Sequence, residues 1–90
     1  MDTQTYLIFT LNDLEYGIET TQVREIFKLP ELTPIADAPG DIIGILNFRD
    51  TVLPVMHLAK RLGQDSPVCQ LSDNIIVMEW QGMQVGIVVD

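Results

Sequence analysis

One histidine and one cysteine, His57 and Cys69, are the residues in this chain best suited to nucleophilic or metal chemistry. They are separated by a loop, and no basic or oxyanion-forming motif surrounds Cys69. A Cys–His nucleophile is therefore not favoured. A single cysteine and a single histidine are also too few for a Cys- or His-rich metal site. We expect no metal site.

Acidic residues offer a second route to chemistry. Asp41, Asp50 and Asp65 could act as paired carboxylates, but no two of them share a motif with an acid or base partner. Their positions are more typical of turns. The sequence contains no P-loop, no G-x-G-x-x-G and no H-E-x-x-H. We therefore predict that the chain is not an enzyme and binds no cofactor.

Chain length and charge limit the number of domains and the kinds of partner that this protein could bind. The 90 residues, 47% of them hydrophobic, predict a single small domain over residues 1–90. Five basic against 13 acidic residues give a net charge of −8, and the basic residues form no run. Nucleic acid and membrane surfaces are excluded as primary partners, because both are anionic. With no signal peptide, no apolar run long enough to span a bilayer and one cysteine, we expect a cytoplasmic location.

The elements that must position any site are mostly strands. Residues 5–19 predict a hairpin turning at Asn12-Asp13, and IIGILNF and TVLPVMHL predict two strands joined near Arg49-Asp50. A further hairpin over residues 74–90 turns at Gln81-Gly82 beside Trp80, which we expect to pack, with an interface role as the alternative. Residues 57–63 predict one or two helical turns. The fold class is mainly β, a small closed barrel with short helices at its corners.

The run ETTQVREIFKLP predicts a helix of about two turns. Thr20 or Thr21 would cap its N-terminus, and Val23, Ile26 and Phe27 would form one apolar face. The helix is expected to plug one end of the barrel. The Pro-rich connector that follows predicts at most an edge strand, over residues 32–36.

Two features predict irregular pairing. Gly44 lies inside a strand, which indicates a bulge or the close approach of another backbone. The chain stops in the apolar strand VGIVVD, and an unpaired strand of this kind invites association. We therefore expect a domain truncated at its C-terminal end, and either a strand-exchanged homodimer or poor solubility.

Several of these segments together resemble one family. EYGI at 15–18, VREI at 23–26, IIGILNFRDTVLPVMHL at 42–58 and VGIVVD at 85–90 are similar to the CheW-like domain of bacterial chemotaxis. The family pattern G-x-x-N-x-R-G-x-x-x-P-V-x-D-L is matched at Gly44, Asn47, Arg49, Pro54, Val55 and Leu58. Asp50 replaces the usual Gly of the turn, and His57 replaces the usual Asp.

The resemblance implies two linked five-stranded SH3-like β-barrels, of which this chain would hold the first part. It also implies a non-enzymatic adaptor that couples the cytoplasmic tips of chemoreceptors to the regulatory domain of a CheA-type histidine kinase. A regulatory CheW-like module of a kinase, or of a CheV-type protein, is an alternative. An unrelated small ligand-binding β-barrel is another, and it would show a concave pocket with convergent polar groups.

The partner-binding residues predicted on this basis are Val23, Glu25, Ile26, Gly44 and Arg49. Arg49 is placed in a hairpin turn between apolar strands, and the resemblance implies that it lies near VREI. We therefore predict a charge-assisted contact between Arg49 and Glu25. Val23 is expected either in the core or at a receptor surface, Ile26 mainly in the core, and Gly44 at a close backbone approach or an interface.

Overall fold

Two-residue turns with positive φ at both positions connect the antiparallel hairpins of this computed structural model, which describes residues 3–64 and 73–90. Such type I′ turns match the twist of the strands that they join, and they favour Asn, Asp and Gly. The φ angles are 52° and 65° at Asn12-Asp13, 49° and 65° at Arg49-Asp50, and 52° and 79° at Gln81-Gly82. All three turns lie where the sequence predicts them.

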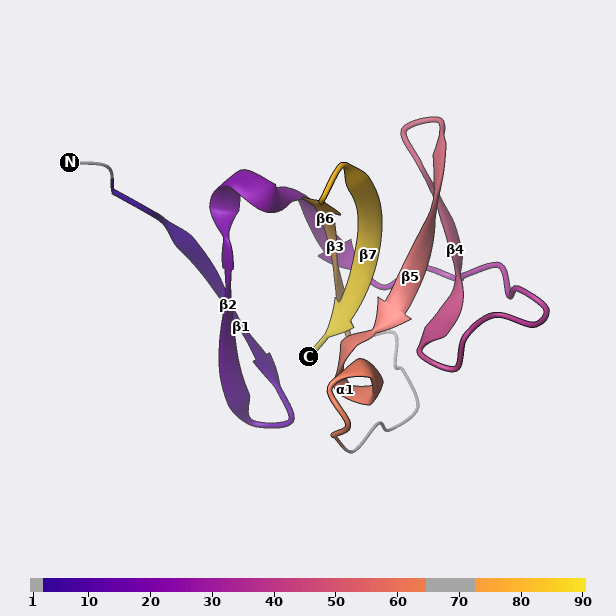
Figure 1. The fold of residues 1–90 in the computed structure, drawn as a ribbon, viewed down its shortest axis with the longest axis horizontal. Helices are drawn as coiled ribbons and strands as arrows, with labels where there is room; N and C mark the ends of the chain where they lie inside the picture. The colour runs from indigo at the N-terminus through magenta and orange to yellow at the C-terminus, as the bar shows by residue number, and fades with distance from the viewer. Residues whose placement is uncertain (1–2, 65–72) are drawn as a thin grey trace.

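The strands form two sheets (Figure 1). The first is the hairpin of β1 (Tyr6–Leu11) and β2 (Leu14–Glu19). The second has the order β3-β6-β7-β5-β4, from β3 (Val23–Lys28), β4 (Ile42–Phe48), β5 (Thr51–His57), β6 (Asn74–Trp80) and β7 (Met83–Val89). A 3₁₀ turn, η1 (Thr20–Gln22), joins β2 to β3, and a short helix, α1 (Leu58–Arg61), follows β5.

The five-stranded sheet curls so that its edge strands, β3 and β4, approach each other. The rings of Phe27 on β3 and Phe48 on β4 stack with their centroids 6.2 Å apart. Farther along β4, Thr33 forms an isolated bridge with Ile45. These contacts close the sheet into a barrel, which agrees with the predicted mainly β, SH3-like fold.

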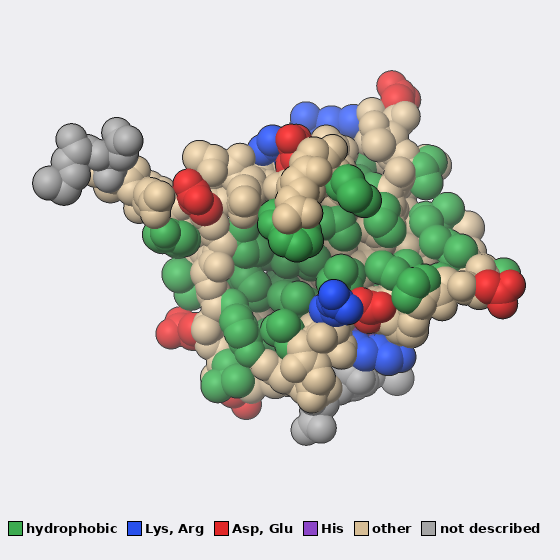
Figure 2. All heavy atoms as spheres, in the orientation of Figure 1, with side chains coloured by type: hydrophobic (Ala, Val, Ile, Leu, Met, Phe, Trp, Pro, Cys, Tyr) green, Lys and Arg blue, Asp and Glu red, His purple; other side chains and the backbone are tan. Residues whose placement is uncertain are grey.

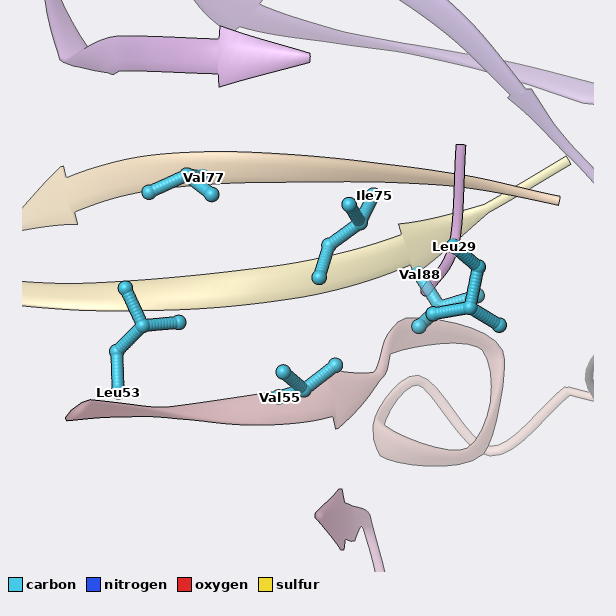
Figure 3. Close-up of a cluster of buried hydrophobic side chains, with 6 residues drawn as sticks. All are labelled: Leu29, Leu53, Val55, Ile75, Val77 and Val88. Carbon is cyan, nitrogen blue, oxygen red and sulfur yellow. The ribbon is translucent and has the colours of Figure 1, made fainter. Parts of the chain in front are cut away.

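Apolar side chains fill the interior of the barrel. Figure 3 shows side chains from β5, β6, β7 and the residue after β3 pointing toward one another. This cluster consists of Leu29, Leu53, Val55, Ile75, Val77 and Val88, and each is at most 8% exposed. Among the described residues no polar or charged residue is buried. The interior is therefore a packed core and offers no polar ligand pocket.

The β1–β2 hairpin packs on the outside of the barrel (Figure 1). A second buried cluster, Ile76, Ile87 and Val89, lies on the outer face of β6 and β7, where it meets Leu7, Phe9 and Ile18 of the hairpin. Alternation along β6 explains the two clusters, because Ile75 and Val77 point into the barrel and Ile76 points out. Strands β6 and β7 are thus apolar on both faces.

The helix predicted from ETTQVREIFKLP is wrong. Only Thr20–Gln22 form a 3₁₀ turn, and Val23–Lys28 are strand β3. The three apolar residues that suggested a helical face also fit a strand rich in β-branched and aromatic residues. Pairing with β6 decided between the two, since it satisfies the backbone groups of β3 and buries Phe27 beside Ile75.

Two expectations about strand edges also fail. Strand β7 does not lack a partner, because it pairs antiparallel with β6 and parallel with β5. The premise of the strand-exchanged homodimer is therefore wrong. Residues 32–36 form no strand beyond the single bridge at Thr33.

The remaining elements agree with their predictions. Helix α1 ends as expected, with Gly63 at a φ of 73°. Pro54 lies in β5 one residue before its pairing with β7 begins at Val55. Asp65 and Cys69 lie outside the described residues. Within residues 3–64 and 73–90, no helix is long and apolar enough to cross a membrane.

Candidate partner-binding site

A bulge in β3 sets the direction of Glu25. The register with β6 shifts between Val23, which pairs with Met78, and Glu25, which pairs with Val77. Side chains directly opposite each other lie on one face of a sheet. Val23 therefore lies on the outer face with Met78, whereas Glu25 lies on the inner face at the barrel rim. Without the bulge, strict alternation would put Val23 and Glu25 on the same face.

Arg49 reaches Glu25 from the β4–β5 turn. Its Nη2 donates to Glu25 Oε2 at 2.6 Å, and its guanidinium lies 5.1 Å from the centroid of the Phe48 ring. The contact predicted between Arg49 and Glu25 is present. Together with the Phe27–Phe48 stack, the ion pair spans the seam between β3 and β4.

The charges of this pair remain open to solvent. The Arg49 side chain is 74% exposed and that of Glu25 is 37% exposed. An exposed ion pair contributes only about 0–1 kcal/mol to stability, because water screens it and two long side chains must be ordered. The ion pair therefore adds little to the stability of the fold. Its main effect is to fix the position of the Arg49 side chain at the rim, where a partner could bind.

Gly44 lies where another segment crosses β4. A Cβ built on Gly44 would be 2.9 Å from both the Cβ of Leu32 and the carbonyl oxygen of Thr33. The register of β4 with β5 also shifts between Ile42 and Gly44. The bulge and the close backbone approach that the sequence offered as alternatives are thus both present. These contacts explain Gly44 by packing.

Val23 and Ile26 both lie on the outer face of the barrel. Val23 is half-buried against the second cluster. Ile26 is 48% exposed, so its expected place mainly in the core is wrong. Ile26 is exposed because this segment is a strand and not a helix. In the strand Ile26 pairs with Ile76 on the outer face, while Phe27 points inward. The five predicted residues therefore do not form one site. Glu25 and Arg49 form an ion pair at the barrel rim, Val23 and Ile26 lie on the outer face, and Gly44 lies where the Leu32–Thr33 segment crosses β4.

Sequence reasoning missed several exposed residues of β3, β6 and β7. Arg24 donates to Glu79 at 2.8 Å, which makes a second ion pair that links β3 to β6. Trp80, expected to pack, is 57% exposed, and its strand partner Met83 is 66% exposed. The position of Trp80 beside a predicted turn was the available signal, since residues that flank a hairpin turn lie at the end of a sheet.

A groove separates β2 from the barrel. It has a volume of about 480 Å³ and runs between Tyr16 and Ile18 on one side and Met78, Trp80 and Ile87 on the other. Figure 2 shows hydrophobic side chains gathered on the face where the hairpin meets the barrel.

The described residues contain no cluster of three or more His, Cys, Asp or Glu side chains that could hold a metal ion.

The model of the CheW-like domain matches residues 5–90. This chain belongs to the CheW-like domain family. It is 37% identical over 87 residues to the chemotaxis protein CheW of Klebsiella aerogenes, which covers 97% of this chain and 52% of the relative. It is 35% identical over 86 residues to CheW of Bacillus subtilis, which covers 93% of this chain and 54% of the relative.

A solved structure agrees with the family assignment. The chain superposes on the scaffolding protein TtCheW of Thermoanaerobacter tengcongensis with a TM-score of 0.89 and 32% identity. The match covers 100% of this chain and 61% of that protein. The chain spans about half the length of the curated CheW relatives that it matches. The predicted truncation at the C-terminal end stays a prediction.

The two departures from the family motif leave the CheW-like strands intact. Asp50 adopts a φ of 65°, so the Arg49-Asp50 turn is type I′ although Asp tolerates this region less well than Gly. His57 is the last residue of β5, and its backbone N–H donates to the carbonyl oxygen of Asp41 at 2.8 Å. Neither residue interrupts the β4–β5 pairing.

Proposed function

We propose that this CheW-like chain is a non-enzymatic chemotaxis adaptor, which couples the cytoplasmic tips of chemoreceptors to the regulatory domain of a CheA-type histidine kinase. Family membership and the likeness to a scaffolding protein support the adaptor role. The apolar barrel interior favours an interaction module over a ligand-binding barrel. A cytoplasmic location is part of the same proposal.

The observation that carries the proposed site is the Glu25–Arg49 pair. It joins residues 24 positions apart in the sequence at a solvent-exposed rim, where it adds little to stability. An ordered arginine over an aromatic ring presents a fixed pattern of donors to a partner. We infer that the pair orients Arg49 toward the kinase or receptor surface, with Val23 and Ile26 as adjoining apolar contacts.

Charge reversal with a matched control tests this proposal. The chain would be tested by biolayer interferometry against the regulatory domain of the CheA-type kinase, and against a receptor tip, from the same genome. Glu25→Arg and Arg49→Glu should each weaken binding about tenfold or more, since each places like charges together. Combining the two re-forms the ion pair and should recover part of the affinity, and the loss that remains measures the donors that Arg49 itself presents.

The control is the second ion pair, between Arg24 and Glu79, whose side chains are 38% and 41% exposed and which shares no residue with the Glu25–Arg49 pair. Exchanging these two charges by Arg24→Glu with Glu79→Arg should leave both affinities within about twofold of the unmodified chain. Binding by neither partner to the unmodified, folded chain would overturn the adaptor proposal. Unchanged binding after both single reversals would instead overturn the proposed site.

A further inference from the structure

The β1–β2 hairpin is attached to the barrel through few covalent constraints. It forms a sheet of its own, and the η1 link to β3 contains no buried residue. A link of three residues with no buried side chain does not by itself fix the orientation of the hairpin relative to the barrel. The position of the hairpin must therefore come from contacts made elsewhere along its length.

The β1 side of the hairpin is docked directly. Leu7 and Phe9 pack on the second buried cluster. The backbone N–H of Asp90 donates to the carbonyl oxygen of Thr10 at 3.2 Å, and the Asp90 carboxylate accepts from the backbone N–H of Asn12 at 2.8 Å. These bonds attach β1 to the end of β7.

Around Tyr16, β2 is separated from the barrel by the groove of about 480 Å³, whereas Ile18 packs on the second cluster. Gln64 bridges this gap. Its Nε2 donates to the hydroxyl of Tyr16 on β2, and its Oε1 accepts from Asn12 Nδ2 at 3.2 Å. Its backbone N–H donates to the carbonyl oxygen of Ala59 at 2.9 Å, which anchors Gln64 to the last turn of α1. One side chain thus connects β2 and the β1–β2 turn to the barrel.

We propose that Gln64 is the positioning residue that holds β2 at its distance from the barrel and so sets the width of the groove. The apolar contacts that the hairpin makes with the second cluster come from β1 and from Ile18 near the end of β2, and they can act as a hinge for the part of β2 around Tyr16. Without the Gln64 bridge, β2 is attached through β1, Ile18 and η1, and the hairpin opens locally while the barrel stays folded. The proposal concerns the hairpin alone and does not depend on the identity of any partner.

Hydrogen–deuterium exchange of the whole chain, read by mass spectrometry, tests the bridge. Gln64→Ala removes two hydrogen bonds, so the amides of β1 and β2 should exchange roughly 5- to 30-fold faster, while those of β5, β6 and β7 keep their rates. Tyr16→Phe removes one bond and should give about a fivefold increase. Trp80 lines the groove and is the only tryptophan, so acrylamide should quench its fluorescence more strongly in both variants.

Two comparisons separate positioning from general stability. Gln64→Glu keeps an oxygen that accepts from Asn12 and another that accepts from the Tyr16 hydroxyl, so it should restore exchange to within about twofold of the unmodified chain. Gln84→Ala, on β7, is the matched control and should leave the hairpin amides unchanged. The proposal is overturned if hairpin exchange does not rise in Gln64→Ala, if barrel exchange rises by the same factor, or if Gln64→Glu behaves like Gln64→Ala.

Discussion

Replacing Gly44 by alanine tests whether the segment that crosses β4 needs a residue without a side chain. The new Cβ would stand 2.9 Å from the Thr33 carbonyl oxygen and from the Leu32 Cβ. Both atoms are backbone or attached directly to it, so neither can turn away by a change of rotamer. Either the overlap is retained or the Leu32–Thr33 segment moves.

Both responses carry a similar cost. Retaining the overlap costs about 1–3 kcal/mol, the usual range for overpacking. Moving the segment breaks the two hydrogen bonds of the bridge, from Thr33 N–H to Ile45 at 3.2 Å and from Ile45 N–H to Thr33 at 2.8 Å, at about 0.5–1.5 kcal/mol each. The lower chain entropy of unfolded alanine offsets about 0.4–1 kcal/mol. The net expected loss is about 1–2 kcal/mol.

Urea unfolding followed by far-ultraviolet circular dichroism measures this loss, and thermal unfolding should show a Tm lower by roughly 4–16 °C. Gly40→Ala is the matched control, since its Cβ would meet only Lys60 at 3.8 Å, an ordinary contact. Equal stabilities for the two variants would refute the close-approach argument. So would Thr33 and Ile45 amides that exchange no faster in Gly44→Ala.

Three further predictions concern stability, each measured as the free energy of unfolding in urea. Asp50→Gly should stabilise the chain by about 0.5–1 kcal/mol, because φ is 65° at this position, whereas Asp50→Ala should not; equal effects would assign the change to the lost charge. Ile75→Ala should cost about 2–5 kcal/mol and Ile26→Ala under about 1 kcal/mol, since the residues are 0% and 48% exposed; similar losses would contradict the strand register of β3. Arg49→Ala should cost less than about 1 kcal/mol, and a larger loss would show that the rim pair is mainly structural.

Local sequence signals were enough to place the hairpins and their turns. Asn12-Asp13 tolerates positive φ in both residues, and the flanking runs alternate with a period of two. The same reasoning predicted the bulge at Gly44, since a glycine inside an apolar strand usually marks a bulge or the close approach of another backbone. The Arg49–Glu25 contact was foreseen only through the resemblance to the CheW-like family, as nothing local joins a turn to a strand 24 residues earlier.

Local signals failed where two structures satisfy the same pattern. Val23, Ile26 and Phe27 fit one face of a helix. They also fit a strand with a bulge between Val23 and Glu25, because the bulge reverses which side chains point into the barrel. The run VGIVVD was expected to lack a partner because it is an apolar strand with no further strand after it in the sequence. The parallel pairing of β7 with β5 is nonlocal and leaves no periodic signal in either strand.

The β class, the three tight turns and the glycine after α1 could all be predicted from residue types, because each depends on a few neighbouring positions. The acidic charge follows from composition alone. Which faces those strands bury depends on long-range packing instead. Barrel closure brought Phe27 to Phe48 and Glu25 to Arg49, and docking of the hairpin left a groove beneath β2. These contacts join segments far apart in the chain, and their energies depend on how the sheet curls, which no short window of residues specifies.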